Sequence, residues 1–105
     1  MCAADQAVLA DEGLRGLMIA NSAELYRQGG RGMYDEALVL ARPWGFELAD
    51  VRAPVSIWQG KHDETVPLAM AHHLAREIPD STLRLFDNDG HHLLYRRWPE
   101  ILAAL

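Results

Sequence analysis

The sequence contains a single cysteine, no long apolar run and no excess of basic residues. One cysteine cannot form an internal disulfide, so nothing in the chain requires an oxidising compartment. No apolar stretch approaches the twenty or so residues of a membrane-spanning helix, and no basic segment precedes an apolar one as in a secretion signal. We therefore expect a cytoplasmic protein that does not enter a membrane.

Positive charge is also scarce, because ten lysines and arginines stand against fifteen aspartates and glutamates. The formal net charge of -5 and the isoelectric point near 5.4 disfavour nucleic acids and anionic membrane surfaces as partners. Half of the 105 residues are hydrophobic, which argues against disorder. The length leaves room for a modest hydrophobic core.

Residues 54–92 have the pattern of a strand, a helix and a second strand. Residues 55–59 and 82–86 are short apolar runs with β-branched and aromatic members, as in buried strands. Between them, residues 67–78 carry a helical stripe with a period of four, at Met70, Leu74 and Ile78. A strand, helix and strand of these lengths form a right-handed crossover with parallel strands. The sequence thus predicts an α/β fold class.

An acid and an imidazole follow the two predicted strands. Asp63 lies in the loop after the first strand, and Gly90, His91 and His92 lie in the loop after the second. Because the carboxyl ends of parallel strands emerge at the same sheet edge, these side chains are expected to meet. A carboxylate that accepts the Nδ1 proton of a histidine prepares its Nε2 to take a proton from a nucleophile.

The residues of this stretch resemble the C-terminal part of an α/β-hydrolase. The match consists of the following residues: Pro54, Val55, Trp58, Gln59, Gly60, Asp63, Val66, Pro67, Ala71, Leu74, Ala75, Ile78, Pro79, Gly90 and His91. The resemblance implies that Asp63 is the catalytic acid and His91 the catalytic base. The adjacent His92 remains the rival for the role of base, and the glycine immediately before His91 favours His91.

The resemblance also implies a partial α/β-hydrolase fold. We expect a helical cap-like segment over residues 1–50, with two helices, and the C-terminal part of the hydrolase core over residues 51–105. The implied function is that of a C-terminal fragment of a serine hydrolase, acting on a small-molecule ester or amide. Such a fragment would be inactive alone.

The chain lacks the sequence motif that carries the nucleophile in that family. Family members carry it on a Gly-Xaa-Ser-Xaa-Gly turn upstream of the acid, and this chain has no such motif. The only serines are Ser22, Ser56 and Ser81, and none is flanked by glycines. Cys2 lies in no motif.

Two other functional classes remain open. A non-catalytic remnant of the hydrolase fold would act through contacts, and two parallel strands alone leave open edges and apolar surface, so self-association is expected. A zinc site would use His62 and Asp63 with His91 or His92, but no dense set of ligands is present. We therefore expect neither a metal nor a cofactor.

The remaining segments are predicted from local signals. Asp11 is expected to cap a helix over residues 12–28, a glycine-rich break follows at residues 29–32, and a second helix covers residues 33–41. Near the C-terminus, residues 92–97 are predicted to form a turn or short helix, and Pro99 to begin a final helix. Asp87 and Asp89 are expected to shape the turn before Gly90, and Arg96 and Arg97 to be solvated surface charges.

Overall fold

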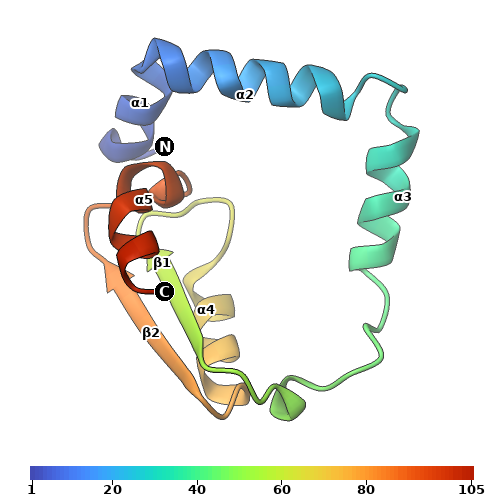
Figure 1. Ribbon diagram of the computed structural model, residues 1–105, viewed down its shortest axis with the longest axis vertical. Helices are drawn as coiled ribbons and strands as arrows, with labels where there is room; N and C mark the ends of the chain where they lie inside the picture. Colours follow the sequence, from blue (N-terminus) through green and yellow to red (C-terminus); the bar gives the residue numbers. More distant parts are fainter.

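The computed structural model describes residues 1–105 and is a mixed α/β structure with a two-stranded parallel sheet (Figure 1). Along the chain the elements are α1 (Ala3–Ala10), α2 (Glu12–Leu25), α3 (Arg31–Leu40), the short 3₁₀ helix η1 (Leu48–Asp50), β1 (Val55–Gly60), α4 (Leu68–Glu77), β2 (Ser81–Phe86) and α5 (Leu93–Ala103). The predicted α/β class and the parallel crossover are confirmed. None of the helices combines the length and hydrophobicity that crossing a bilayer requires.

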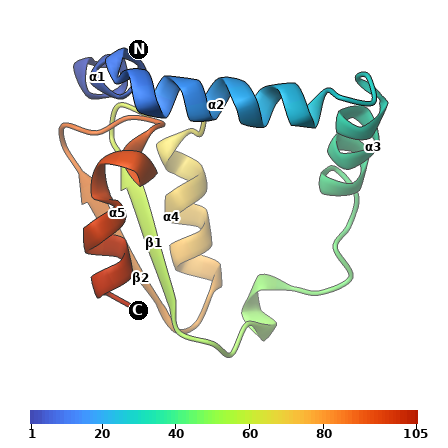
Figure 2. The same cartoon turned by 45° about the horizontal axis from the view of Figure 1, so that its top comes forward.

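The two strands pair in register from Val55 opposite Ser81 to Gly60 opposite Phe86. Helices α4 and α5 lie on opposite sides of this sheet (Figure 2). Between α5 and the sheet runs a groove of about 540 Å³ whose lining includes Ser56 and Trp58 of β1 and Leu93 of α5. The strand–helix–strand unit therefore carries the sheet edge on which the predicted site residues lie.

Few side chains are fully buried. The buried apolar residues are Val8, Ala71, Ile78 and Leu93, which come from α1, α4 and α5 and from the turn after α4. Helices α2 and α3 bury no residue at all, and they extend away from the sheet as two sides of an open frame (Figure 1).

The N-terminal part differs from the prediction in its details. Three helices precede the sheet instead of two, because residues 3–10 form the complete helix α1. Helix α2 ends at Leu25, before the predicted end, and α3 already begins at Arg31, so the break covers residues 26–30 and lies earlier in the chain than the glycines indicated. Only Gly29 in that break has a positive φ, of 80°, which favours glycine. The predicted cap is confirmed, since the Asp11 carboxylate accepts a hydrogen bond from the Leu14 amide at 2.9 Å.

Helix α5 contains the discontinuity that the sequence predicted. Arg97 has non-helical dihedrals of -111° and 16°, two residues before Pro99. Proline lacks an amide hydrogen and its ring collides with the preceding turn, so the helix bends where the two predicted pieces meet. The bend allows Arg97 to face the sheet and pack its guanidinium 4.1 Å from the centre of the Phe86 ring.

Candidate functional site

Asp63 and His91 meet at the carboxyl edge of the sheet. The Oδ2 atom of Asp63 lies 3.1 Å from the Nδ1 atom of His91. Asp63 comes from the loop after β1 and His91 from the loop after β2, so the parallel crossover brings together two residues 28 positions apart. The structure therefore brings these two predicted site residues into direct contact.

The local turn after β1 holds the Asp63 carboxylate. Its Oδ1 atom accepts hydrogen bonds from the backbone amides of Thr65 and Val66, both at 2.8 Å. The side chain is only 8% exposed. Burial raises the pKa of Asp63, but hydrogen bonds from Val66, Thr65 and His91 outweigh it and hold the pKa below its usual value.

This arrangement determines which nitrogen of His91 carries a proton. An ionised carboxylate only accepts hydrogen bonds, so the Nδ1 atom of a neutral His91 carries its proton and donates it to Asp63. The Nε2 atom is then unprotonated and available as a base. The His91 side chain is 43% exposed, so the ring is accessible from outside the chain.

The loops that carry these two residues pack against each other without intervening side chains. The His62 amide donates to the Asp89 carbonyl at 3.0 Å, and the Lys61 amide donates to the Phe86 carbonyl at 2.9 Å. A Cβ atom on Gly60 would lie 2.5 Å from the carbonyl carbon of Asp89, so glycine permits this close approach. The geometry of the Asp63–His91 pair thus rests on backbone contact between the two loops.

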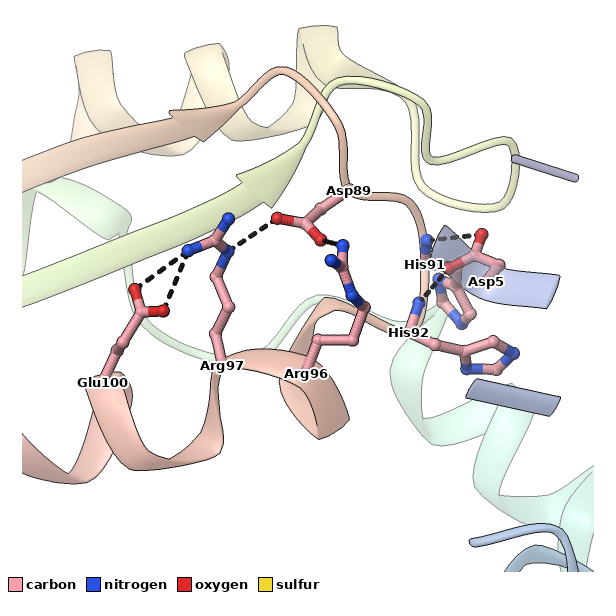
Figure 3. A network of polar contacts seen from close by, with 7 residues as sticks. All are labelled: Asp5, Asp89, His91, His92, Arg96, Arg97 and Glu100. Atoms are coloured by element: carbon pink, nitrogen blue, oxygen red, sulfur yellow. Dashed lines mark hydrogen bonds and ion pairs between the residues drawn. The ribbon is translucent and has the colours of Figure 1, made fainter. Parts of the chain in front are cut away.

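Asp89 has a larger role than the turn-forming one predicted for it. It is fully buried and accepts hydrogen bonds from Arg96 and, at 2.6 Å, from the Nε atom of Arg97 (Figure 3). Arg97 also donates to Glu100 at 2.9 Å. The prediction that Arg96 and Arg97 are solvated surface charges was therefore wrong for the half-buried Arg97 and incomplete for Arg96, which is exposed but pairs with Asp89, because a buried carboxylate requires partners of opposite charge.

Asp5 was missed altogether by the sequence analysis. It is buried, although it belongs to α1, and its carboxylate accepts hydrogen bonds from the backbone amides of His91 and His92 (Figure 3). The only signal in the sequence is an acid within an alanine-rich helix, which by itself indicates no contact.

The other candidates are not joined to the pair. The His92 ring lies between His91 and Tyr95, with ring centres 5.5 Å and 6.1 Å away, and makes no hydrogen bond to a carboxylate. The Ser81 hydroxyl donates to the carbonyls of Ala75 in α4 and Ile78 just after it, Ser22 is exposed on α2, and Ser56 is exposed on β1. No three histidine, cysteine, aspartate or glutamate side chains come together as a metal site.

Comparison with known proteins finds similarity over part of the chain. A pimeloyl-[acyl-carrier protein] methyl ester esterase from Aromatoleum aromaticum is 46% identical over 48 residues, which are 46% of this chain and 19% of the esterase. A 2-hydroxy-6-oxononadienedioate/2-hydroxy-6-oxononatrienedioate hydrolase from Pseudomonas putida is 40% identical over 48 residues, or 17% of its length. The matched region thus spans less than a fifth of these relatives.

No family model and no solved structure matches the chain. Both curated relatives are enzymes of the α/β-hydrolase family, and their names describe hydrolytic activities. Over these 48 residues the chain is therefore related in sequence to the α/β-hydrolase family, and the resemblance drawn from its motifs is confirmed.

Proposed function

We propose that this chain supplies the acid and the base of a serine-hydrolase triad, with Asp63 as the acid and His91 as the base. The observation that carries the proposal is the 3.1 Å contact between Asp63 Oδ2 and His91 Nδ1. The substrate class is a small-molecule ester or amide, in keeping with the hydrolase names of the relatives.

The mechanism assigns one task to each residue. His91 Nε2 takes the proton of an attacking serine hydroxyl and later gives it to the leaving group. Asp63 stays ionised, holds the Nδ1 proton and stabilises the imidazolium that forms. Because Ser22, Ser56 and Ser81 make no contact with His91, the nucleophile comes from polypeptide outside these residues. The chain alone is therefore proposed to be inactive.

A graft tests this proposal directly. In the Aromatoleum esterase, the C-terminal counterpart of residues 54–105 would be replaced by these residues, leaving the upstream part of that enzyme in place. We expect the chimera to hydrolyse a methyl ester. Within it, Asp63→Asn and His91→Ala should each lower kcat by about three to four orders of magnitude, because the base loses its orientation or is absent.

Matched variants separate the proposed residues from their neighbours. His92→Ala and Asp87→Asn in the same chimera should retain most of the activity, since neither side chain forms a hydrogen bond with the Asp63–His91 pair, although the His92 ring lies 5.5 Å from the His91 ring. If His92→Ala abolishes hydrolysis while His91→Ala does not, the base is His92. A fluorophosphonate probe should label no serine in the 105-residue chain alone, and labelling would refute the absence of a nucleophile.

The alternative function is that of a non-catalytic, self-associating remnant of the hydrolase fold. It is favoured by the large apolar side chains that α2 and α3 expose, among them Leu17 at 61% and Val39 at 63%. An inactive but correctly folded chimera, together with stable oligomers of the 105-residue chain, would support this function over the catalytic one.

A further inference from the structure

The carboxylate of Asp5 lies directly against the backbone of the His91 loop. Its Oδ2 atom accepts a hydrogen bond from the His91 amide at 3.1 Å, and its Oδ1 atom accepts one from the His92 amide at 2.8 Å (Figure 3). The residue is 4% exposed. Helix α1 thus reaches across 86 sequence positions to hold two consecutive amides.

Gly90 makes this contact possible. A Cβ atom at residue 90 would collide with the Asp5 carboxylate and would lie 2.7 Å from its Cγ atom. It would also lie 2.7 Å from the Sγ atom of Cys2. The absence of a side chain at this position is therefore what lets the carboxylate sit beside the loop.

The electrostatics favour an ionised Asp5. Burial raises the pKa of its carboxyl group, but the hydrogen bonds from His92, His91 and Cys2 outweigh burial, so the pKa lies below its ordinary value. No lysine or arginine forms an ion pair with Asp5. The amide dipoles of the loop are consequently its main partners, and charge-assisted hydrogen bonds of this kind are short and directional.

His91 needs such support from its backbone. Its only side-chain hydrogen bond is the one to Asp63, the side chain is 43% exposed, and the ring lies 5.5 Å from the His92 ring. The preceding glycine gives the loop wide conformational freedom unless other contacts restrict it. The direction of the ring toward Asp63 therefore depends on how firmly residues 90–92 are held.

We propose that Asp5 is a positioning residue for the His91 imidazole, acting through the two backbone amides that its carboxylate binds. The consequence for catalysis rests on the proposed function, whereas the effect on the geometry of His91 does not. On this proposal α1 is part of the functional site without touching substrate.

Nuclear magnetic resonance of the 105-residue chain tests the proposal without any enzymatic reaction. Long-range ¹H–¹⁵N spectra of the histidine rings report the tautomer of His91, which in the native chain should carry its proton on Nδ1. In Asp5→Ala we expect this tautomer to give way to a mixture. Amide exchange at residues 91 and 92 should become at least about tenfold faster, because two charge-assisted bonds are lost.

A second variant perturbs the same contact from the other side. Gly90→Ala keeps Asp5 but displaces its carboxylate, so it should give the same change in the His91 ring spectrum. Asp11→Ala is the matched control, because it removes another helix-associated aspartate that contacts only the start of α2. It should leave the His91 spectrum unchanged. The rings of His72 and His73 on α4 should keep their native spectra in all three variants.

Asp5→Asn resolves the case in which Asp5→Ala does not fold. It preserves the shape of the side chain and one acceptor oxygen, so we expect a smaller shift of the His91 tautomer in the same direction. A folded Asp5→Ala or Asp5→Asn chain with native His91 tautomer and exchange rates would overturn the proposal. If the esterase chimera does not hydrolyse the methyl ester, that result would instead count against the proposed function and leave the role of Asp5 intact.

Discussion

At the scale of single residues, the carboxylates of this site differ in what surrounds them. Asp63 and Asp5 are both buried and both bound mainly by backbone amides, whereas Asp89 is enclosed by two guanidinium groups. Amide-bound carboxylates stay ionised without bringing a competing positive charge next to the imidazole. This arrangement is suited to a base that must itself become positively charged.

The lowered pKa values of Asp63 and Asp5 predict a loss of stability in acid. A group whose pKa is lower in the folded chain contributes stability above its unfolded value of 3.8 and loses it as the pH falls toward the folded value. The free energy of unfolding should therefore be nearly constant above about pH 5 and decline below it. Urea titrations at several pH values measure this dependence.

Asp63→Asn provides the control for that measurement. The variant keeps the Lys61–Asp87 pair, whose aspartate also has a lowered pKa, so any difference in slope belongs to Asp63. Its free energy of unfolding should decline less steeply than that of the native chain as the pH falls below about 5. Equal slopes in the two proteins would contradict the assignment.

At the scale of elements, the close contact between the loops after β1 and β2 determines how near Asp63 and His91 lie, more than the strands themselves do. The sequence motifs place Asp63 and His91 after their strands, but the direct backbone packing at Gly60 sets how near the loops approach. The same packing leaves no space for a side chain. Substitution of a glycine at this loop contact should therefore change the free energy of unfolding differently from substitution of a glycine in an exposed helix.

Gly60→Ala should lower the free energy of unfolding by about 1 to 3 kcal/mol, because its Cβ would meet backbone atoms of Asp89 and Gly90 that cannot move independently. Gly16→Ala, in the interior of α2, meets no atom within 4 Å and should raise helix stability by about 0.5 to 1 kcal/mol. Urea unfolding followed by fluorescence and by circular dichroism measures both. A neutral Gly60→Ala would show that the loops are not in close contact.

Some features of the elements could be predicted from local sequence patterns alone. The Asp11 cap and the interruption near Pro99 arise from interactions within a few residues, so local spacing predicted them. The predicted apolar stripe of α4 is only partly buried, because Met70 is 55% exposed whereas Ile78 is buried. The partners of Asp5 and Asp89 were not predictable in this way. They lie in other elements or across a bend in α5, and neither aspartate carries a local sign of burial.

At the scale of the whole molecule, the chain is expanded for its length. Its radius of gyration is 15.9 Å, whereas a compact domain of this length has about 13 Å. Only nine of the 105 residues are buried, because α2 and α3 extend from the sheet without a partner. The apolar side chains exposed on α2 and α3 would leave contact with water if two chains met there, so this surface favours association.

We therefore predict that the isolated chain self-associates, and that sedimentation velocity will show a mass that grows with concentration. Leu17→Lys combined with Val39→Lys should shift the distribution toward monomer, because both side chains are more than 60% exposed on α2 and α3. Gln28→Lys, an exposed polar position, is the control for added charge and should have little effect. A monomer at all concentrations would refute the prediction.

The sequence by itself determined the α/β class, the parallel crossover and the order of acid and histidine, because strand, helix and glycine signals act over short distances. The sequence also led us to expect that Asp63 and His91 meet, as they do. Only the tertiary structure decided that Asp5 holds the histidine loop and that Asp89 is buried beside two arginines. The Asp5 contact depends on the docking of α1 near α5, and the Asp89 contacts depend on how α5 folds back on the turn after β2. Burial of a charged side chain depends on such distant partners, and local sequence does not encode them.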